Sequence, residues 1–462
     1  MTRKTGLLLL ATALAIPLSL PAQDTRATLP DPALDALVAE ALPKSPEISA
    51  AQAQAQAARQ RVAPARTLPD PSASVQYQND GTAISLGEQD MTFLGAMYSQ
   101  PLPWPGKLRL AGEEAERRAE QVEAERVGRA RLAIEARVRR AYYDLALVEA
   151  LLRLLDERRT AWREIAGVAR ERYAAGLAVQ QDALRAQIEL LRLDETQAEL
   201  AAQSANRLAE VNRLLRRPAE QPLEKPGALE LRTSLPALRD LIDAVRDRSP
   251  ELAGARRAIE ADRTRVERAR KDFLPDLTAS AGPMYRGGLD PMWQAGVGVS
   301  LPVFSGSRQR PLLAAARQEL KSAEAQADSL ALDLELATRE RWEALKATLA
   351  AARLYSEAIL PVDRISVESA VASYRTGKVP FVTVLEALNA LYSDRELFLT
   401  RLAEAERRRI AIDEGDPVPG EGMTAGGRAG AAAAPMGAGS AGTGSSMAGS
   451  AGAGTPAPMG MR

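Results

Sequence analysis

The side chains that most often carry out catalysis or hold metal ions are missing from this chain. Its 462 residues include no Cys and no His, which excludes disulfides, thiolate zinc sites, cysteine nucleophiles and histidine acid–base pairs. A Gly-x-Ser-x-Gly elbow and a phosphate-binding glycine loop are missing too. Carboxylates remain, but nothing else in the sequence supports a carboxylate-based hydrolase. We therefore expect neither an enzyme nor a bound cofactor.

The charge balance and composition point to long helices as the elements that position any functional residue. Lys and Arg number 60, as do Asp and Glu, so no net field attracts nucleic acid. Only 4% of residues are aromatic, and the middle of the chain is rich in Ala, Leu, Glu and Arg. This composition is typical of long helices rather than compact, aromatic-filled cores.

The two ends of the chain differ in composition from its middle. A basic start followed by an apolar run from Leu7 to Ile16 predicts a secretory signal peptide over 1–22. No other stretch is apolar for the ~18 residues that a membrane-spanning helix needs. Residues 415–462 are mostly Gly, Ala, Ser, Pro and Met and predict a disordered tail. The mature chain is therefore either soluble or enters a membrane as strands.

The chain between these ends repeats the same signals in the same order at a period of roughly 200 residues. The two repeats are predicted to be 23–225 and 226–414. The matched segments are Ser45-Pro46-Glu47 with Ser249-Pro250-Glu251, Pro69-Asp70 with Pro275-Asp276, Gln100-Pro101-Leu102 with Leu301-Pro302-Val303, and Tyr173-Ala-Ala-Gly176 with Tyr374-Arg-Thr-Gly377. Chance does not explain matches that keep their order over so long a span.

Each repeat predicts a helix, two strands of alternating apolar and polar residues, and two long helices joined by a turn. The strands are expected at about 72–80, 91–101, 277–286 and 292–302, and the long helices at about 108–173, 178–217, 308–374 and 380–412. Apolar residues from Val138 to Leu155 keep the three-four spacing of a coiled coil. Pro361 predicts a kink in the third long helix. The fold class is therefore mainly α with a small β portion of antiparallel strands.

The four strands are near the ~9–11 residues that cross an outer membrane, but four strands cannot close a barrel. An open sheet edge in lipid leaves backbone groups unpaired at several kcal/mol each, so the sheet needs strands from other copies. Three copies would give a twelve-stranded barrel, and two would give a narrower one. The long helices carry too many charges to lie in lipid and would project into the periplasm as a tube.

Several segments resemble the TolC-type outer-membrane efflux protein family. They are the strand exits at 100–106 (Gln-Pro-Leu-Pro-Trp-Pro-Gly) and 301–306 (Leu-Pro-Val-Phe-Ser-Gly), and the turns at 172–176 (Arg-Tyr-Ala-Ala-Gly) and 373–377 (Ser-Tyr-Arg-Thr-Gly). The resemblance covers about 32–414. It implies a homotrimer with a twelve-stranded outer-membrane barrel continuous with a periplasmic α-helical tunnel. It also implies two partners, a periplasmic adaptor (membrane fusion protein) and an inner-membrane RND-type or ABC transporter. The Pro-Trp-Pro-Gly exit is similar to the heavy-metal cation branch, with drugs as the alternative substrate.

The same resemblance assigns roles to the two helical turns, 172–188 and 373–389. The resemblance implies that the tips dock the adaptor through Tyr173, Gly176, Leu184, Gly377 and Leu385. It also implies that the periplasmic gate is formed by Glu386, Thr383, Tyr374 and Asp182.

Within this predicted gate, the resemblance implies a latch in which Tyr374 and Asp182 form a hydrogen bond between the tip helices. Glu386 fits the family's acidic entrance, whereas Thr383 departs from it, so one charged ring is expected rather than two. The competing interpretations are a solvated helix face for Glu386, and plain helix C-caps for Gly176 and Gly377.

Two other functions compete with an efflux duct. A soluble periplasmic coiled-coil scaffold or adaptor would explain the long helices but not four alternating strands repeated in both halves. A passive porin would explain strands but not long periplasmic helices. An exit duct that joins an outer-membrane barrel to a periplasmic tunnel explains both, and it is the function that the sequence favours.

Overall fold

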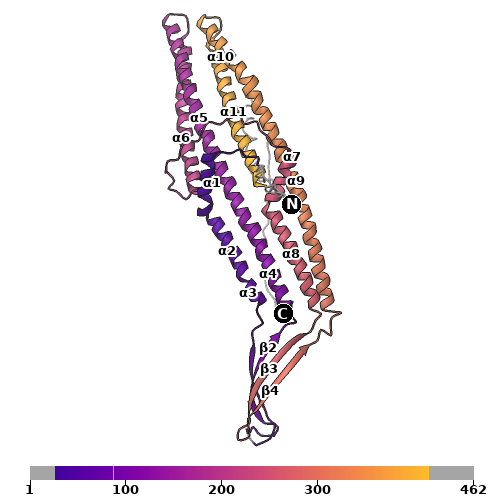
Figure 1. Ribbon diagram of the computed structural model, residues 1–462. Coiled ribbons are helices and arrows are strands. Elements are labelled where there is room, and N and C mark those ends of the chain that lie inside the picture. Colours follow the sequence, from indigo (N-terminus) through magenta and orange to yellow (C-terminus); the bar gives the residue numbers. More distant parts are fainter. Residues whose placement is uncertain (1–25, 87, 416–462) are drawn as a thin grey trace, which may run out of the picture. The chain divides into compact units, whose positions relative to one another are not determined.

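The computed structural model describes residues 26–86 and 88–415, so the predicted signal peptide and C-terminal tail lie outside the described residues. In the first repeat the elements are α1 (Pro32–Lys44), α2 (Pro46–Gln60), α3 (Val62–Arg66), β1 (Ser72–Gln78), β2 (Phe93–Leu102), α4 (Lys107–Val122), the π-helical turn η1 (Glu123–Val127), α5 (Gly128–Ala174) and α6 (Gln180–Leu214). In the second they are α7 (Leu238–Arg248), α8 (Pro250–Lys271), β3 (Asp276–Tyr285), β4 (Met292–Ser300), α9 (Gln309–Leu354), the π-helical turn η2 (Tyr355–Ile359), α10 (Leu360–Arg375) and α11 (Phe381–Glu414). The strands lie at one end of the helices, and the α5–α6 and α10–α11 turns lie at the other (Figure 1).

The repeated Ser-Pro-Glu signals are helix starts. The Ser45 hydroxyl accepts the Ile48 N–H at 3.4 Å, and the Ser249 hydroxyl accepts the Leu252 N–H at 3.2 Å. In both repeats Pro follows at the first helical position, where its missing N–H is not needed. Each Ser also ends a short preceding helix, α1 or α7, that the sequence analysis did not predict.

The four predicted strands form one antiparallel sheet in the order β1-β2-β3-β4. Their bounds differ from the predicted ones by about two residues, mainly at the loop between β1 and β2. One sheet face carries mostly apolar side chains and the other mostly polar or small ones. The apolar face contains Val75, Ala96, Tyr98, Ala281, Trp293, Ala295, Val297 and Val299, and the other contains Ser74, Gln76, Ser99, Thr278, Ser280, Gln294, Gly296 and Gly298. Val75, Trp293 and Val297 are 77%, 79% and 74% exposed, so none of the described residues of one copy covers these side chains of the apolar face.

The strand pairing corrects one match between the repeats. Ser72 pairs with Ser99, and its counterpart Thr278 pairs with Gly298, so Ser99 corresponds to Gly298. Leu102-Pro103 therefore corresponds to Leu301-Pro302, two residues away from the match drawn from the sequence. The sequence match was wrong because the first strand exit contains two prolines two residues apart, and both could align with Pro302.

The long helices form at the predicted places, but a π-helical turn interrupts two of them. The turn η2 ends two residues before Pro361, whose ring clashes with the carbonyl four residues earlier in a regular helix. This interruption is where the kink was predicted. No proline marks η1, which contacts α2 and α8, and there Gly128 approaches Pro250 so closely that a Cβ on it would lie 2.7 Å away. The first interruption therefore lies at a close helix contact and has no local proline signal.

Buried apolar side chains form the contacts between the long helices. The predicted coiled-coil face of α5 is buried, with Val138 fully enclosed and Leu155 at 6% exposure. It packs against α1, α6 and the end of α11. A separate cluster joins α7, α8, α9 and α11. Among the described residues no helix is long and apolar enough to cross a membrane.

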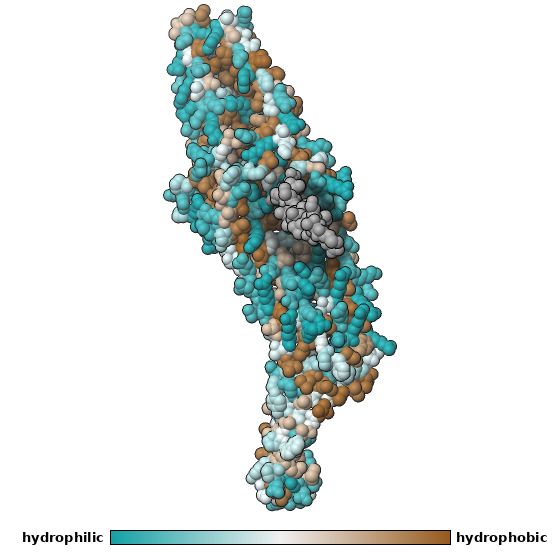
Figure 2. Space-filling model, viewed as in Figure 1, coloured by the Kyte–Doolittle hydropathy of each residue, from teal (hydrophilic) through white to brown (hydrophobic). Residues whose placement is uncertain are grey.

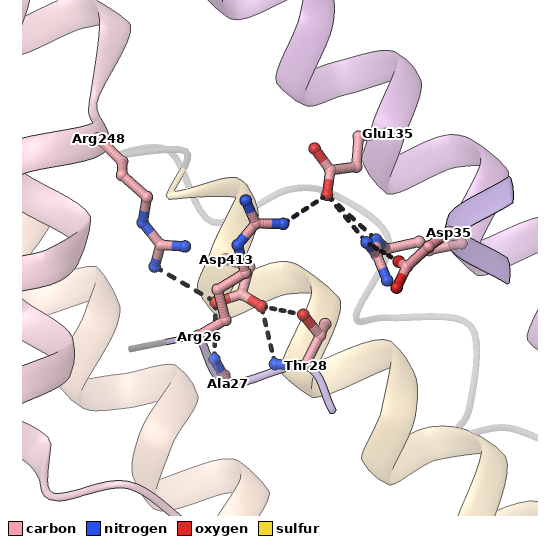
Figure 3. Close-up of polar contacts among 8 residues, drawn as sticks. Arg26, Ala27, Thr28, Asp35, Glu135, Arg248 and Asp413 are labelled. Carbon is pink, nitrogen blue, oxygen red and sulfur yellow. Dashed lines mark hydrogen bonds and ion pairs between the residues drawn. The ribbon is translucent and has the colours of Figure 1, made fainter. Parts of the chain in front are cut away.

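The segment before α1 is hydrogen-bonded to the end of α11 (Figure 3). The Asp413 carboxylate accepts the backbone N–H groups of Ala27 and Thr28, both at 2.8 Å, and the Thr28 hydroxyl at 2.6 Å. Arg248 lies 3.5 Å from the same carboxylate. One carboxylate therefore connects the N-terminal segment, α7 and α11, which are far apart in the sequence.

Candidate functional site: the two helical turns

The two turns that the sequence singled out have the same backbone geometry. Gly176 and Gly377 adopt φ values of 69° and 77°, and each follows the last residues of a long helix. The Gly176 N–H donates to the Tyr173 carbonyl at 2.9 Å, and the Gly377 N–H donates to the Tyr374 carbonyl at 3.0 Å. Both are the glycine C-caps expected from the sequence, because a residue without a Cβ adopts this left-handed conformation without strain.

A hydrogen bond between side chains joins the two turns. Tyr374, at the end of α10, donates its hydroxyl proton to Asp182, at the start of α6, over 3.1 Å. Tyr374 is only 2% exposed, and burial together with the Asp182 charge raises the pKa of the phenol to about 12. The phenol therefore keeps its proton at neutral pH and remains a donor. The structure brings together the pair named from the sequence, while its role as a latch stays a prediction.

Arg172 makes a second connection between the turns, which the sequence analysis missed. Its guanidinium donates to the Tyr374 carbonyl, to the Arg375 carbonyl at 2.7 Å and to the Leu177 carbonyl at 2.9 Å. It also lies over the Tyr374 ring, 4.8 Å from the centroid. The Tyr374 and Arg375 carbonyls end α10, and the Leu177 carbonyl lies just after α5. One cation therefore donates hydrogen bonds to carbonyl groups at both helix ends.

An apolar cluster, named here the tip cluster, lies beneath the turns. Its buried members are Leu154, Leu155, Trp162, Ile165, Ala166, Ala169, Ala186, Leu193, Ala370, Tyr374, Phe381, Val384, Leu388 and Tyr392. Trp162 is fully buried, and the Tyr374 and Phe381 rings meet edge to face at 5.4 Å. The cluster holds α5, α6, α10 and α11 together, so the polar contacts above rest on a packed base.

The residues predicted to dock an adaptor are not all at the surface. Tyr173 and Leu184 are 47% and 50% exposed, and both glycines are exposed. Leu385 is half-buried and packs against the tip cluster. Four of the five predicted docking residues are therefore accessible, while Leu385 mainly supports the turn.

Glu386 and Thr383 lie on the first turns of α11. Glu386 is exposed, and among the described residues its carboxylate makes no hydrogen bond or ion pair. Thr383 is half-buried. An exposed, unpaired carboxylate next to the turn could face either a channel or bulk water, so its gating role stays a prediction.

Comparison with known proteins agrees with this architecture. The family described as outer membrane efflux protein matches residues 37–216 and 241–414. The cobalt-zinc-cadmium resistance protein CzcC of Cupriavidus metallidurans is 24% identical over 384 residues, which are 82% of this chain and 88% of CzcC. The fusaric acid resistance protein FusA of Burkholderia cepacia is 29% identical over 329 residues, 64% of this chain and 60% of FusA.

Solved structures show the same fold. The outer-membrane channel OprN superposes with a TM-score of 0.67 at 20% identity, covering 83% of this chain and 90% of OprN. The family match and this fold together define the class of protein, an outer-membrane channel with long helices. The chain belongs to the outer membrane efflux protein family, as the resemblance predicted. It is an efflux channel of the outer membrane rather than an enzyme or a soluble scaffold.

Proposed function

We propose that this channel works as a homotrimer that forms the exit duct of a tripartite pump. The observation that carries the proposal is the open sheet, in which β1 and β4 both lie at an edge and the apolar face is uncovered. Backbone groups at such edges need partners in lipid. Three copies supply twelve strands, which close a barrel in the outer membrane, and their helices surround a periplasmic tunnel.

The turns are the docking surface for a periplasmic adaptor in this proposal. Apolar side chains are exposed around the first turn, including Leu177 at 67% and Val179 at 62%. Such side chains on an otherwise charged helical pair suit a protein partner. The adaptor, a membrane fusion protein, would connect the duct to an inner-membrane transporter of the RND or ABC type. That transporter supplies the energy in this proposal, because the sequence contains no P-loop motif for a nucleotide.

Heavy-metal cations are the substrate that the observations favour. The similarity to CzcC extends over most of both chains, and Glu386 would place a carboxylate from each copy at the periplasmic entrance. A family-like double acidic ring is not expected, because Thr383 stands at the second position. The similarity to FusA supports an organic acid as the second candidate.

Two measurements test the proposal. Light scattering of the detergent-extracted outer-membrane particle, corrected for detergent, is expected to give three times the mass of one chain. Deleting the gene is expected to lower the concentrations of Co²⁺, Zn²⁺ and Cd²⁺ that stop growth. Greater sensitivity to fusaric acid alone would select the organic substrate, and unchanged sensitivity to both would contradict a role in their export.

Replacing Glu386 with Gln is expected to make the channel roughly twofold less selective for cations. For three carboxylates taken to lie one Debye length, about 10 Å, from the axis, the attraction of a monovalent cation is about 0.4 kcal/mol each in water. Screening at 0.1 M salt leaves about 0.5 kcal/mol in total. The reversal potential of single channels in a KCl gradient measures this change. Glu199→Gln, at an exposed position farther along α6, is the matched control. Equal selectivity in both variants would place Glu386 outside the conducting path.

A further inference from the structure

Asp276, the first residue of β3, connects the two repeats where the chain passes from β2 to α4. Its carboxylate accepts the backbone N–H of Trp104 at 2.8 Å and the ammonium group of Lys107 at 3.0 Å. Lys107 also donates to the Leu274 carbonyl at 3.0 Å, and its side chain is only 12% exposed. The residue that opens a strand of the second repeat therefore holds the loop that leaves a strand of the first.

The repeat places an acidic and a basic residue of the same kind at the two outer edges of the sheet, one near β1 and one near β4. Asp70 precedes β1 as Asp276 opens β3. Arg308 is the first basic residue after β4 and immediately precedes α9, two residues beyond the strict counterpart of Lys107. Both Asp70 and Arg308 are exposed, and within the described residues neither side chain makes a hydrogen bond or ion pair. β1 and β4 are separated by three strand spacings of about 4.8 Å, so one copy cannot join them.

The same correspondence fixes a strand register between copies. Leu102 pairs with Leu277 where β2 meets β3. Their counterparts at the edges are Leu301 and Pro71, and this register sets Val299 against Ala73 and Val297 against Val75. Apolar side chains then meet apolar ones on the exposed face, and Ser74 meets Gly298 on the other. A slip of one residue would place Val297 against Gln76 or Ser74, which the sheet alternation disfavours.

We propose that neighbouring copies join β4 to β1 in this register, with Arg308 of one copy pairing with Asp70 of the next. The occupant of both edges is thus a second copy of this chain. Apolar surface gathers where β4 passes into α9 (Figure 2), where Leu301, Val303 and Phe304 are 65%, 73% and 76% exposed. On the other edge, Leu68 is 46% exposed two residues before Asp70. The proposal rests on the proposed trimer and adds its residue contacts.

Paired cysteines test the register, because the chain has no cysteine of its own. Opposite residues of an antiparallel pair have Cα atoms about 4.5–5.5 Å apart, within disulfide range, whereas diagonal residues lie about 7–8 Å apart. In the full chain, Ser74→Cys with Gly298→Cys is expected to give covalent multimers on a non-reducing gel after mild oxidation. Ser74→Cys with Ser300→Cys, which fits a register slipped by two residues, is the matched control and is expected to remain monomeric.

The outcomes separate the register from the trimer. Cross-linking of the control pair, or of neither pair, in a particle that still has three times the mass of one chain would overturn the register and leave the channel proposal standing. A particle with the mass of one copy would overturn both.

Charge reversal tests the proposed ion pair between Asp70 of one copy and Arg308 of the next. Asp70→Arg is expected to reduce severalfold the fraction of particles that remain multimeric in dilute SDS, and Asp70→Arg with Arg308→Asp is expected to restore it. A double variant no better than the single one would overturn the Asp70–Arg308 pair.

Discussion

Replacing Arg409 with Met is expected to lower the free energy of unfolding by about 3–5 kcal/mol, the range for removing one partner of a buried ion pair. Arg409 on α11 is fully buried, and Glu406 one turn earlier is 5% exposed. The guanidinium donates to the Ala27 carbonyl at 3.0 Å and to the Arg232 carbonyl at 2.7 Å. Its loss would leave a buried carboxylate and two carbonyls without their cation.

The expected loss depends on pH with a definite sign. Burial raises the pKa of the Glu406 carboxyl, and removing the nearby Arg409 charge would raise it further. A carboxyl whose pKa rises on folding destabilises the protein increasingly as pH rises above its unfolded value. Chemical unfolding in detergent, followed by circular dichroism, should therefore show a larger loss for Arg409→Met at about pH 8 than at about pH 5.

The matched control removes both charges. Arg409→Met with Glu406→Gln is expected to recover part of the lost stability and to show little dependence on pH, because no buried carboxyl remains to titrate. A loss in Arg409→Met that is equal at both pH values would show that packing of the arginine stem, rather than the charge pair, is responsible.

Much of the fold could be predicted because its signals are local and repeated. Alternation places Val75 and Val297 on one face of a strand, and the Ser-Pro-Glu segments start helices in both repeats. The short helices α1 and α7 were missed although both show a helical apolar spacing, as at Leu238, Leu241 and Val245 of α7. Their signal is local, so both could have been predicted. The turn η1 was missed because no proline marks it, and its contacts are with α2 and α8, which are far from it in the sequence.

The contacts that hold distant segments together were not predictable from spacing. Arg172 and Arg409 look like any other arginine on a charged helix, and only the packed structure shows that one spans two turns and the other is buried. The pairing of Tyr374 with Asp182 came from the family resemblance rather than from their spacing, and the structure contains that hydrogen bond. In each case the decisive feature is a contact between segments 177 to 382 residues apart in the sequence.

Replacing Arg172 with Ala is expected to raise the open probability of the channel by at least tenfold, and Tyr374→Phe by a smaller factor. Movement that separates the α5–α6 turn from the α10–α11 turn must break the Arg172 bonds to the Tyr374 and Arg375 carbonyls, and the Tyr374 bond to Asp182. A hydrogen bond to a charged group contributes about 1.5–3 kcal/mol, and about 1.4 kcal/mol corresponds to a tenfold change in an equilibrium.

Single-channel recordings in planar bilayers measure the open probability, and uptake of an antibiotic too large for general porins measures the same opening in cells. Arg185→Ala is the matched control, since Arg185 is exposed on α6 and its side chain makes no hydrogen bond or ion pair within the described residues. Because Tyr374→Phe keeps the ring and its packing on Phe381, it removes only the bond to Asp182. Opening in Arg172→Ala but not in Tyr374→Phe would assign the closed state to the arginine. Closed channels in both variants would mean that the turns move together, and that the constriction lies between copies rather than between the two turns of one copy.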